Sequence, residues 1–240
     1  MLPLMWRVGK NFIICSLLLA VGLWYGARWY FTHVYPIQLH VQQQVIAQMN
    51  AQHSSPLSYS EIPAMYRKAV IATEDRTFET NIGISFRGIG RALWVDIRGG
   101  QALQGGSTIT QQLVHNTVLR QIPKSIGWKF IEMFDSVGLY DTMSKADVFM
   151  LYANDIYFGQ QAYGLYAASE AYFGLPPSQL NAGELTMLAG LPNAPSDYDP
   201  FVNMKLARMR QKFVVSRMVL DGQVTKTQAN AILNDPIQLQ

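Results

Sequence analysis

Two neighbouring acids, Glu74 and Asp75, are well suited by type and position to acid–base chemistry. They follow the apolar residues Ala69, Val70 and Ile71, which have the pattern of a helix. Burial of a carboxyl group in apolar surroundings raises its pKa and makes it a better proton acceptor near neutral pH. The pattern therefore predicts a general base, and a charged pair on a solvated helix face is the alternative.

A glycine-rich segment starting at Gly105 could bind an anion. It reads Gly-Gly-Ser-Thr, and we expect a helix to begin there, with Ser107 as its N-cap before Ile109. The free N–H groups and positive dipole end of a helix start, with the hydroxyls of Ser107 and Thr108, can face an anionic oxygen. An ordinary capped turn is the alternative. Together with the two acids, the segment points to glycosyl chemistry.

The elements that must position these residues are helices. Helical periodicity continues from Ile62 onward, and alternating patterns typical of strands are scarce, so the sequence predicts a mostly α fold. Capping residues stand where helices should begin, and glycines where they should end. The predicted N-caps are Ser85, Ser107, Ser144 (with Asp147) and Asn181 (with Glu184), and the predicted stops are Gly174 and Gly222.

An uncharged apolar stretch near the N-terminus has the composition of a membrane helix. It covers residues 11–27, and Lys10 and Arg28 flank it. The stretch is short for a span, but snorkelling of the flanking cations and interfacial aromatic rings extend it. The basic N-terminal flank predicts a cytoplasmic N-terminus. A cleaved signal peptide is the alternative, although no small-x-small cleavage site follows.

The chain thus divides into four expected parts. They are a cytoplasmic N-terminus (1–10), a transmembrane anchor (11–31), a juxtamembrane helix and linker (32–59) and the main domain (60–240). The length of 240 residues fits one domain plus an anchor, and we expect no second large enzyme domain. The single cysteine, Cys15, lies in the anchor, so we expect no disulfide and no thiolate site in the main domain.

The charge distribution argues against a nucleic-acid partner. The net charge of +3 lies almost wholly in the anchor, which leaves 16 basic and 16 acidic residues beyond Phe31. Within this neutral part, residues 85–129 are locally basic, which suits pyrophosphate or anionic lipid headgroups. Segment 87–120 also mixes apolar residues with arginines, so we weigh a membrane-proximal face against an ordinary core helix. The basic residues are Arg87, Arg91, Arg98, Arg120, Lys124 and Lys129, against Asp96.

A series of ordered motifs over most of the chain resembles the peptidoglycan glycosyltransferase family. This family comprises monofunctional transglycosylases and the glycosyltransferase domain of class A penicillin-binding proteins. The resemblance implies a lysozyme-like, two-lobed helical domain with a cleft between the lobes, preceded by one N-terminal transmembrane helix. The matching segments are 72–78, 105–113, 129–132, 151–159, 162–164, 172–174 and 188–196.

The resemblance also implies a reaction. A lipid-linked disaccharide-peptide (lipid II) is joined to a growing glycan strand through a sugar 4-hydroxyl, with inversion and release of undecaprenyl pyrophosphate. Glu74 matches the family's general base. Glu132 matches its second carboxylate, which is expected to orient cations or to hold a divalent cation, Mg²⁺ or Mn²⁺. A surface acid paired with Lys129 is the alternative for Glu132.

Further residues match the family's substrate-binding positions. Hydroxyls and amides can hold sugar and phosphate oxygens without a fixed charge. Each has a structural alternative: an N-cap or an ion pair with Arg76 or Arg91 for Asp75, helix capping in the glycine-rich motif, and packing for Asn154. The expected substrate-binding residues are Asp75, Ser107, Thr108, Gln111, Gln112, His115, Lys129 and Asn154.

Three positions depart from the family pattern. Asn81 stands where a histidine is common, His115 where a lysine is usual, and Trp128 where an arginine is common. Loss of one charge-assisted contact costs on the order of 1.5 to 3 kcal/mol. The alternative function is therefore a membrane-anchored relative of low or no activity that binds the precursor or partner cell-wall synthases.

A lysozyme-like hydrolase would also use a lone glutamate, but it needs neither the anchor nor the basic segment. The expected partners are lipid II, the growing strand, the membrane and other cell-wall synthesis and division proteins. The expected location is the bacterial inner membrane, crossed once, with the catalytic domain in the periplasm.

Overall fold

The computed structural model describes residues 2–52, 54–86, 88, 106–123 and 125–240, with side chains from Asn11 onward except that of Ile126. Within this part the chain is helical, and the β-structure is limited to one isolated bridge between Tyr157 and Tyr163. The prediction of a mostly α chain that begins with an apolar helix is confirmed. The helix expected after Ser85, and most of the expected membrane-proximal segment, lie outside the described residues.

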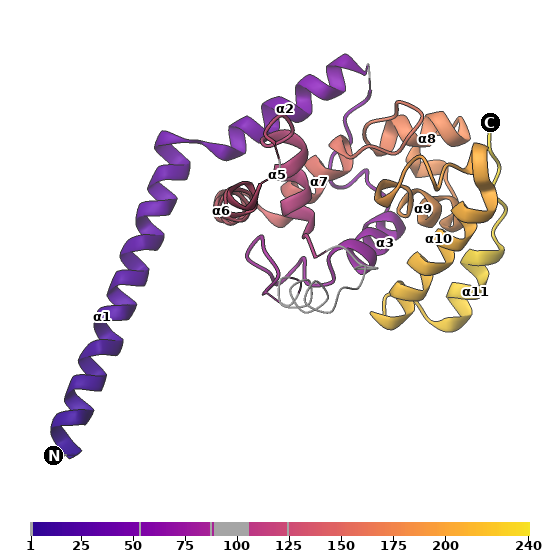
Figure 1. Ribbon diagram of the computed structural model, residues 1–240. Helices are drawn as coiled ribbons and strands as arrows, with labels where there is room; N and C mark the ends of the chain where they lie inside the picture. The colour runs from indigo at the N-terminus through magenta and orange to yellow at the C-terminus, as the bar shows by residue number, and fades with distance from the viewer. Residues whose placement is uncertain (1, 53, 87, 89–105, 124) are drawn as a thin grey trace.

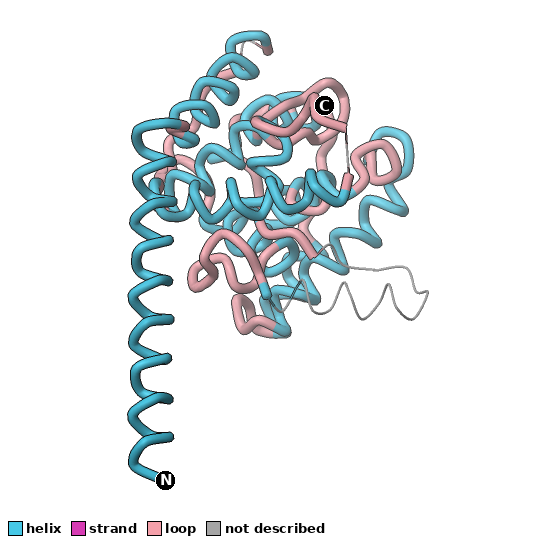
Figure 2. Tube along the Cα trace, turned by 60° about the vertical axis from the view of Figure 1, so that its left-hand side comes forward, coloured by secondary structure: helices cyan, strands magenta, loops and turns pink. Residues whose placement is uncertain are grey.

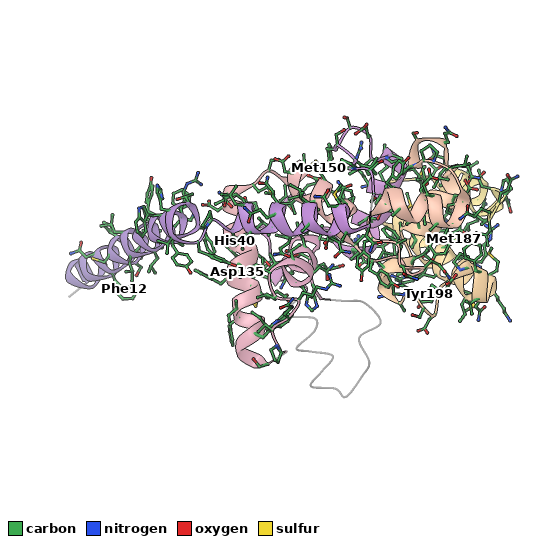
Figure 3. All side chains as sticks on the ribbon, turned by 90° about the horizontal axis from the view of Figure 1, so that it is seen from above. Phe12, His40, Asp135, Met150, Met187 and Tyr198 are labelled. Carbon is green, nitrogen blue, oxygen red and sulfur yellow. The ribbon has the colours of Figure 1, made fainter. Side chains whose placement is uncertain are left out.

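The N-terminal helix projects from the rest of the molecule. Helix α1 (Leu2–Trp29) continues into a short π-helix, η1 (Tyr30–Val34), and the two views in Figures 1 and 2 show α1 extending beyond the other helices. Figure 3 places Phe12 near the far end of α1. Among the described residues, Asn11–Val34 is the one helical segment long and apolar enough to cross a membrane, and none of its most apolar part is buried.

The C-terminal end of this segment is fixed to the main domain. Phe31 is buried and packs against Gly138 of α6 (Ile126–Thr142), where an added Cβ would lie 2.4 Å from the Phe31 ring. Arg28 Nη1 donates to Asp141 Oδ2 over 3.0 Å. Glycine at position 138 leaves room for the Phe31 ring, so the end of the anchor packs directly against α6.

The remaining helices form two groups that contact each other around the site. The first group packs around α5, and its α2 buries an i, i+4 stripe of apolar residues. The second group packs around α9 and α10, while α8 contacts one helix of each group. The first group is α2 (Ile37–Ala51), α5 (Ile109–Thr117), α6 and α7 (Lys145–Asp155). The second is α3 (Ala64–Glu74), α9 (Ala182–Leu188), α10 (Pro200–Leu220) and α11 (Lys226–Asn234), with α8 (Leu165–Phe173) between them and the short 3₁₀ helices η2 (Pro177–Gln179) and η3 (Leu191–Asn193).

For the helices that the structure describes, the capping predictions are confirmed except at α5, and the cap predicted at Ser85 lies before a segment outside the described residues. Ser144 and Asn181 cap α7 and α9, and Gly174 ends α8 in the left-handed conformation. The predicted cap Ser107 is wrong, because Thr108 is the N-cap of α5. A capping box needs a Glu or Gln three residues after the cap, and Gln111 supplies it for Thr108.

Candidate active site

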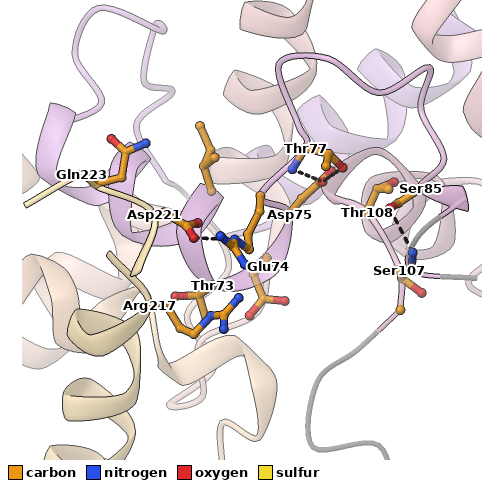
Figure 4. A pocket seen from close by; sticks show the side chains of 14 residues that line it. Thr73, Glu74, Asp75, Thr77, Ser85, Ser107, Thr108, Arg217, Asp221 and Gln223 are labelled. Atoms are coloured by element: carbon orange, nitrogen blue, oxygen red, sulfur yellow. Dashed lines mark hydrogen bonds and ion pairs between the residues drawn. The ribbon is translucent and has the colours of Figure 1, made fainter. Parts of the chain in front are cut away.

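A pocket of about 460 Å³ lies where the end of α3, the start of α5 and the end of α10 meet. Figure 4 shows Glu74 and Arg217 on one side of it, with Ser107 and Thr108 on the other. The predicted base and the glycine-rich motif therefore share one cavity. Its described lining residues are Ile71, Thr73, Glu74, Asp75, Arg76, Thr77, Ser85, Gly88, Gly106, Ser107, Thr108, Arg217, Asp221 and Gln223.

Glu74 is the last residue of α3, and its carboxylate is held by two other helices. Gln112 Nε2 of α5 donates to Glu74 Oε2 over 2.9 Å. Arg210 Nη2 of α10 lies 3.5 Å from Glu74 Oε1. The side chain of Glu74 is 16% exposed. The apolar run before Glu74 thus supplies burial, while the carboxylate itself faces an amide and a cation.

Arg210 is a site residue that the sequence analysis missed. The sequence did not single out Arg210, because α10 contains several other basic residues. Arg210 also lies more than a hundred positions from Glu74 along the chain. Only the packing of α10 against α3 brings the two charges together.

Asp75 faces inward and braces the backbone around the site. Its oxygens accept from Asn81 Nδ2 over 3.0 and 2.9 Å and from Ile109 N, the first N–H of α5, over 3.3 Å. Burial raises the pKa of Asp75, and the bonds from Asn81, Ile109 and Thr77 oppose that rise. The alternative of an ion pair with Arg76 is wrong, because Arg76 pairs with Asp221. Asp75 lines the pocket, but its oxygens are occupied within the protein.

Asn81, one of the three departures, completes this bracing. It donates to Asp75, and its Oδ1 accepts from Lys145 Nζ over 2.9 Å and from Gly83 N over 3.0 Å. An amide can donate at one end and accept at the other, which this position requires. The substitution at Asn81 is therefore accommodated structurally, with Lys145 supplying the nearby positive charge.

The second carboxylate lies at the centre of a polar cluster on α6. Glu132 is 2% exposed, and its Oε1 accepts from Gln111 Nε2 over 3.0 Å and pairs with Lys129 Nζ. Lys129 also donates to Ser107 Oγ over 3.3 Å. His115 Nδ1 lies 3.8 Å from Glu132 Oε2. The structure thus brings together five predicted residues: a buried carboxylate, a half-exposed ammonium, an imidazole, a hydroxyl and an amide.

Consecutive glutamines of α5 connect the two carboxylates. Gln111 donates to Glu132 and, through Oε1, accepts from Thr108 N in the capping box. Gln112 donates to Glu74. Neighbouring helical residues point about 100° apart, so two adjacent side chains can reach groups on different sides of one helix. Helix α5 therefore sets the position of both acids.

His115 and Trp128, the other two departures, pack against each other with ring centroids 5.0 Å apart in an edge-to-face arrangement. Trp128 is buried, and Lys129 lies 6.0 Å from its ring. Arg120 instead bonds to Gln48 and Tyr163. The basic residues Arg87, Arg91, Arg98 and Lys124 lie outside the described residues. Of the expected basic surface, the structure therefore describes only Arg120 and Lys129.

Two predicted substrate-binding residues are engaged within the protein. Asn154 Oδ1 accepts from Leu57 N over 3.0 Å, and its Nδ2 donates to Leu57 O over 2.8 Å. It therefore ties the linker to α7 and lines neither pocket, which matches its packing alternative. Thr108 lines the main pocket, but its hydroxyl caps α5 and donates to Gly83 O over 2.6 Å.

The donor set around Glu132 does not form a metal site by itself. Among the described residues, no group of three or more His, Cys, Asp or Glu side chains is placed to share a metal ion. The amide and ammonium of Gln111 and Lys129 already donate to Glu132. A site built from protein ligands alone therefore does not fit these residues.

A second cavity of about 360 Å³ is lined by His115 and by a buried acid, Asp155. Burial raises the pKa of Asp155 to about 6, against a weaker opposing effect of Asn116 and Arg120. Tyr157 and Tyr163 line the same cavity, with ring centroids 4.7 Å apart.

Asp155 should make the protein less stable as pH rises. The pKa of Asp155 is about 6 in the folded protein and 3.8 ordinarily, so the folded state binds this proton more tightly than the unfolded state. The resulting gain in the free energy of unfolding is complete below about pH 4 and is lost as the pH rises through 6. We expect Asp155→Asn to raise the free energy of unfolding at pH 7.5 by on the order of 1 to 3 kcal/mol, and to have little effect near pH 4. Denaturant unfolding of both proteins at each pH measures this. The exposed Asp197→Asn is the control, and an equal gain at both pH values would contradict the prediction.

Comparison with known proteins gives one consistent family. A family model described as "Transglycosylase" matches residues 42–219. The chain is 36% identical over 229 residues to Penicillin-binding protein 1A of Escherichia coli (strain K12), covering 90% of this chain and 27% of that protein. It is 37% identical over 203 residues to Penicillin-binding protein 1A of Vibrio cholerae, covering 84% and 24%. The chain thus spans about a quarter of the length of these relatives.

A crystal structure of Penicillin-Binding Protein 1A from Haemophilus influenzae overlaps 78% of this chain and 18% of its own, at 22% identity and a TM-score of 0.46. That overlap adds nothing to what the helices above show. The family match covers most of the chain, including both carboxylates and the two glutamines between them. On that match, the chain belongs to the transglycosylase family.

Proposed function

We propose that this protein is an inverting peptidoglycan glycosyltransferase that polymerises lipid II into glycan strands and releases undecaprenyl pyrophosphate. The observation that carries the proposal is the pair of carboxylates, the partly buried Glu74 and the buried Glu132, each held by one of two adjacent glutamines of α5. Family membership and the likeness to Penicillin-binding protein 1A support the same reaction.

In this proposal Glu74 is the general base. It takes the proton of the acceptor sugar's 4-hydroxyl, and the hydroxyl oxygen then bonds to the donor's anomeric carbon while the bond to the diphosphate breaks. A positioned base contributes roughly 10²- to 10⁴-fold to such a step. Glu74 fits the role because it lies in the pocket and its carboxylate is fixed by two neighbours.

Lys129 and Ser107 would receive the diphosphate. Lys129 is 43% exposed, so its ammonium can contact substrate while Glu132 and Ser107 orient it. A preorganised positive charge stabilises negative charge that develops on a leaving group. The family resemblance also implies a divalent cation, Mg²⁺ or Mn²⁺; Glu132 would be the residue that holds it, and the ion would supply positive charge for the leaving diphosphate.

The membrane arrangement is likewise proposed. The segment Asn11–Val34 would cross the bacterial inner membrane once, with the N-terminus in the cytoplasm and the domain in the periplasm. Its fixed contact with α6 would hold the site close to lipid-linked substrate. Other cell-wall synthesis and division proteins are the expected partners.

The test is polymer formation by the detergent-purified protein from labelled lipid II. We expect glycan strands that a muramidase digests, with one equivalent of undecaprenyl pyrophosphate released for each disaccharide added. Parallel reactions with Mg²⁺, with Mn²⁺ and with chelator test the cation. Binding of lipid II without polymer would favour the non-catalytic relative, for which the His115–Trp128 pair in place of two cations is the supporting observation. Cleavage of preformed strands would instead indicate a hydrolase.

A further inference from the structure

The surroundings of Glu74 include a cation to which the reaction above gives no role. Arg210 lies on α10, and its side chain is 9% exposed, less than the 16% of Glu74. Its Nη2 lies 3.5 Å from Glu74 Oε1. A guanidinium keeps its charge at every pH at which the protein is folded, so a positive charge lies beside the carboxylate throughout.

Arg210 is held in place by groups other than Glu74. Its Nε donates to Gly190 O over 3.2 Å, and its guanidinium lies 4.9 Å from the Phe213 ring and 5.6 Å from that of Tyr198. A Cβ on Gly190 would lie 2.9 Å from Arg210 Cγ, so glycine makes room for the arginine stem. The guanidinium is therefore fixed before substrate binds.

The two oxygens of Glu74 are held unequally. Oε2 accepts a bond of ordinary length, 2.9 Å, from Gln112 Nε2. Among the described residues, the hydrogen-bond partner of Oε1 is Arg210 at 3.5 Å, which is longer than an ordinary charge-assisted bond of about 2.7 to 2.9 Å. Oε1 is thus the oxygen with capacity for a further, shorter hydrogen bond.

We propose that Arg210 is a positioning residue, which together with Gln112 fixes the ionised Glu74 carboxylate so that Oε1 accepts the proton of the acceptor hydroxyl. This inference rests on the proposed function. The hydroxyl O–H bond breaks and its proton bonds to Oε1. The electron pair of that O–H bond forms the new bond to the anomeric carbon, and the diphosphate leaves with the pair of the broken C–O bond.

The other groups that face Glu74 do not replace this charge. Tyr66 of α3 and Tyr152 of α7 lie near it, and burial, with a smaller effect of the Glu74 charge, raises the pKa of each, so both stay neutral. Burial also lowers the pKa of Arg210, while Glu74 opposes that effect.

The other charged side chains in the described lining of the pocket make no ion pair with Glu74. Arg76 pairs with Asp221, and Asp75 bonds to Asn81. Arg217 lines the pocket. Among the described residues, Arg210 is the cation whose ion pair with Glu74 the structure shows.

The experiment compares Arg210→Gln and Arg210→Lys with Lys212→Gln, which removes an exposed charge from the same helix. The kcat of polymer formation is measured at saturating lipid II from about pH 5 to 9. This range should include the acidic limb of the pH profile, where kcat falls because the general base is protonated. In parallel, the carboxyl carbon of Glu74 is titrated by ¹³C NMR and assigned with Glu74→Gln. Thermal unfolding reports whether each variant folds.

For Arg210→Gln we expect the acidic limb and the NMR midpoint to move up together by about one pH unit, because a nearby cation favours the ionised carboxylate. The kcat should fall about tenfold on the acidic side and recover at higher pH, with KM within about twofold of wild type. In Arg210→Lys the acidic limb should lie close to its wild-type pH, and in Lys212→Gln it should not move.

An equal loss of kcat at every pH, with an unmoved NMR midpoint, would show that Arg210 only braces α10 and would overturn the inference. Unchanged kcat and midpoint would do the same. If wild type makes no polymer, the proposed function fails. The NMR midpoint then still decides whether Arg210 holds Glu74 in its ionised form.

Discussion

Replacing Glu74 with glutamine should abolish measurable polymer formation while leaving the protein folded. Glutamine keeps the size of the side chain and can still bond to Gln112, but it cannot take a proton from the acceptor hydroxyl. Loss of a positioned general base lowers the rate by roughly 10²- to 10⁴-fold. The measurement is the initial rate of glycan synthesis from labelled lipid II, with thermal unfolding as the check on folding.

The control is Glu79→Gln, which removes an exposed acid from the turn after α3. It should polymerise at the wild-type rate. A general base raises the rate by roughly 10²-fold or more. If Glu74→Gln retained more than about a tenth of wild-type activity, another group would have to be that base, and the assignment of Glu74 would be wrong.

The second large effect is expected at Lys129. Lys129→Met removes the ammonium that Glu132 and Ser107 orient, and loss of a charge-assisted contact of about 1.5 to 3 kcal/mol lowers turnover roughly 10- to 150-fold. The same change leaves Glu132 buried with one charge partner fewer. Because Lys129 is half exposed, we expect a loss of only about 1 to 2 kcal/mol in the free energy of unfolding.

A second substitution separates these two effects. In Lys129→Met combined with Glu132→Gln, the buried charge is gone, so stability should return to near the wild-type value while activity stays low. Lys129→Arg keeps the charge and should retain part of the activity. Recovery of polymer formation in the double variant would mean that Lys129 matters only because it neutralises Glu132. Denaturant unfolding and initial rates on the same samples provide both measurements.

The residues that the sequence identified best are those whose order along the chain carries information. Glu74, Ser107, Gln111 and Glu132 lie in motifs of fixed sequence, and the structure brings them into one region. Helix starts at Ser144 and Asn181 were predictable because a cap acts over three residues.

What the sequence could not show depends on side chains that meet across the fold. Arg210 meets Glu74 only through the packing of α10 on α3. Asn154 has a residue type that suits sugar binding, but it bonds to Leu57, far away in the sequence. Thr108, and not the predicted Ser107, is the N-cap of α5, because Gln111 stands three residues after Thr108 and completes its capping box.

The adjacent glutamines of α5 also bear on how a strand could grow. Gln111 and Gln112 differ by one residue of one helix, a rise of about 1.5 Å, and each holds one acid. The two acids lie on different helices, α3 and α6, yet both accept hydrogen bonds from one turn of α5. Within the proposed reaction, a shift of α5 would therefore disturb the base and the second carboxylate together.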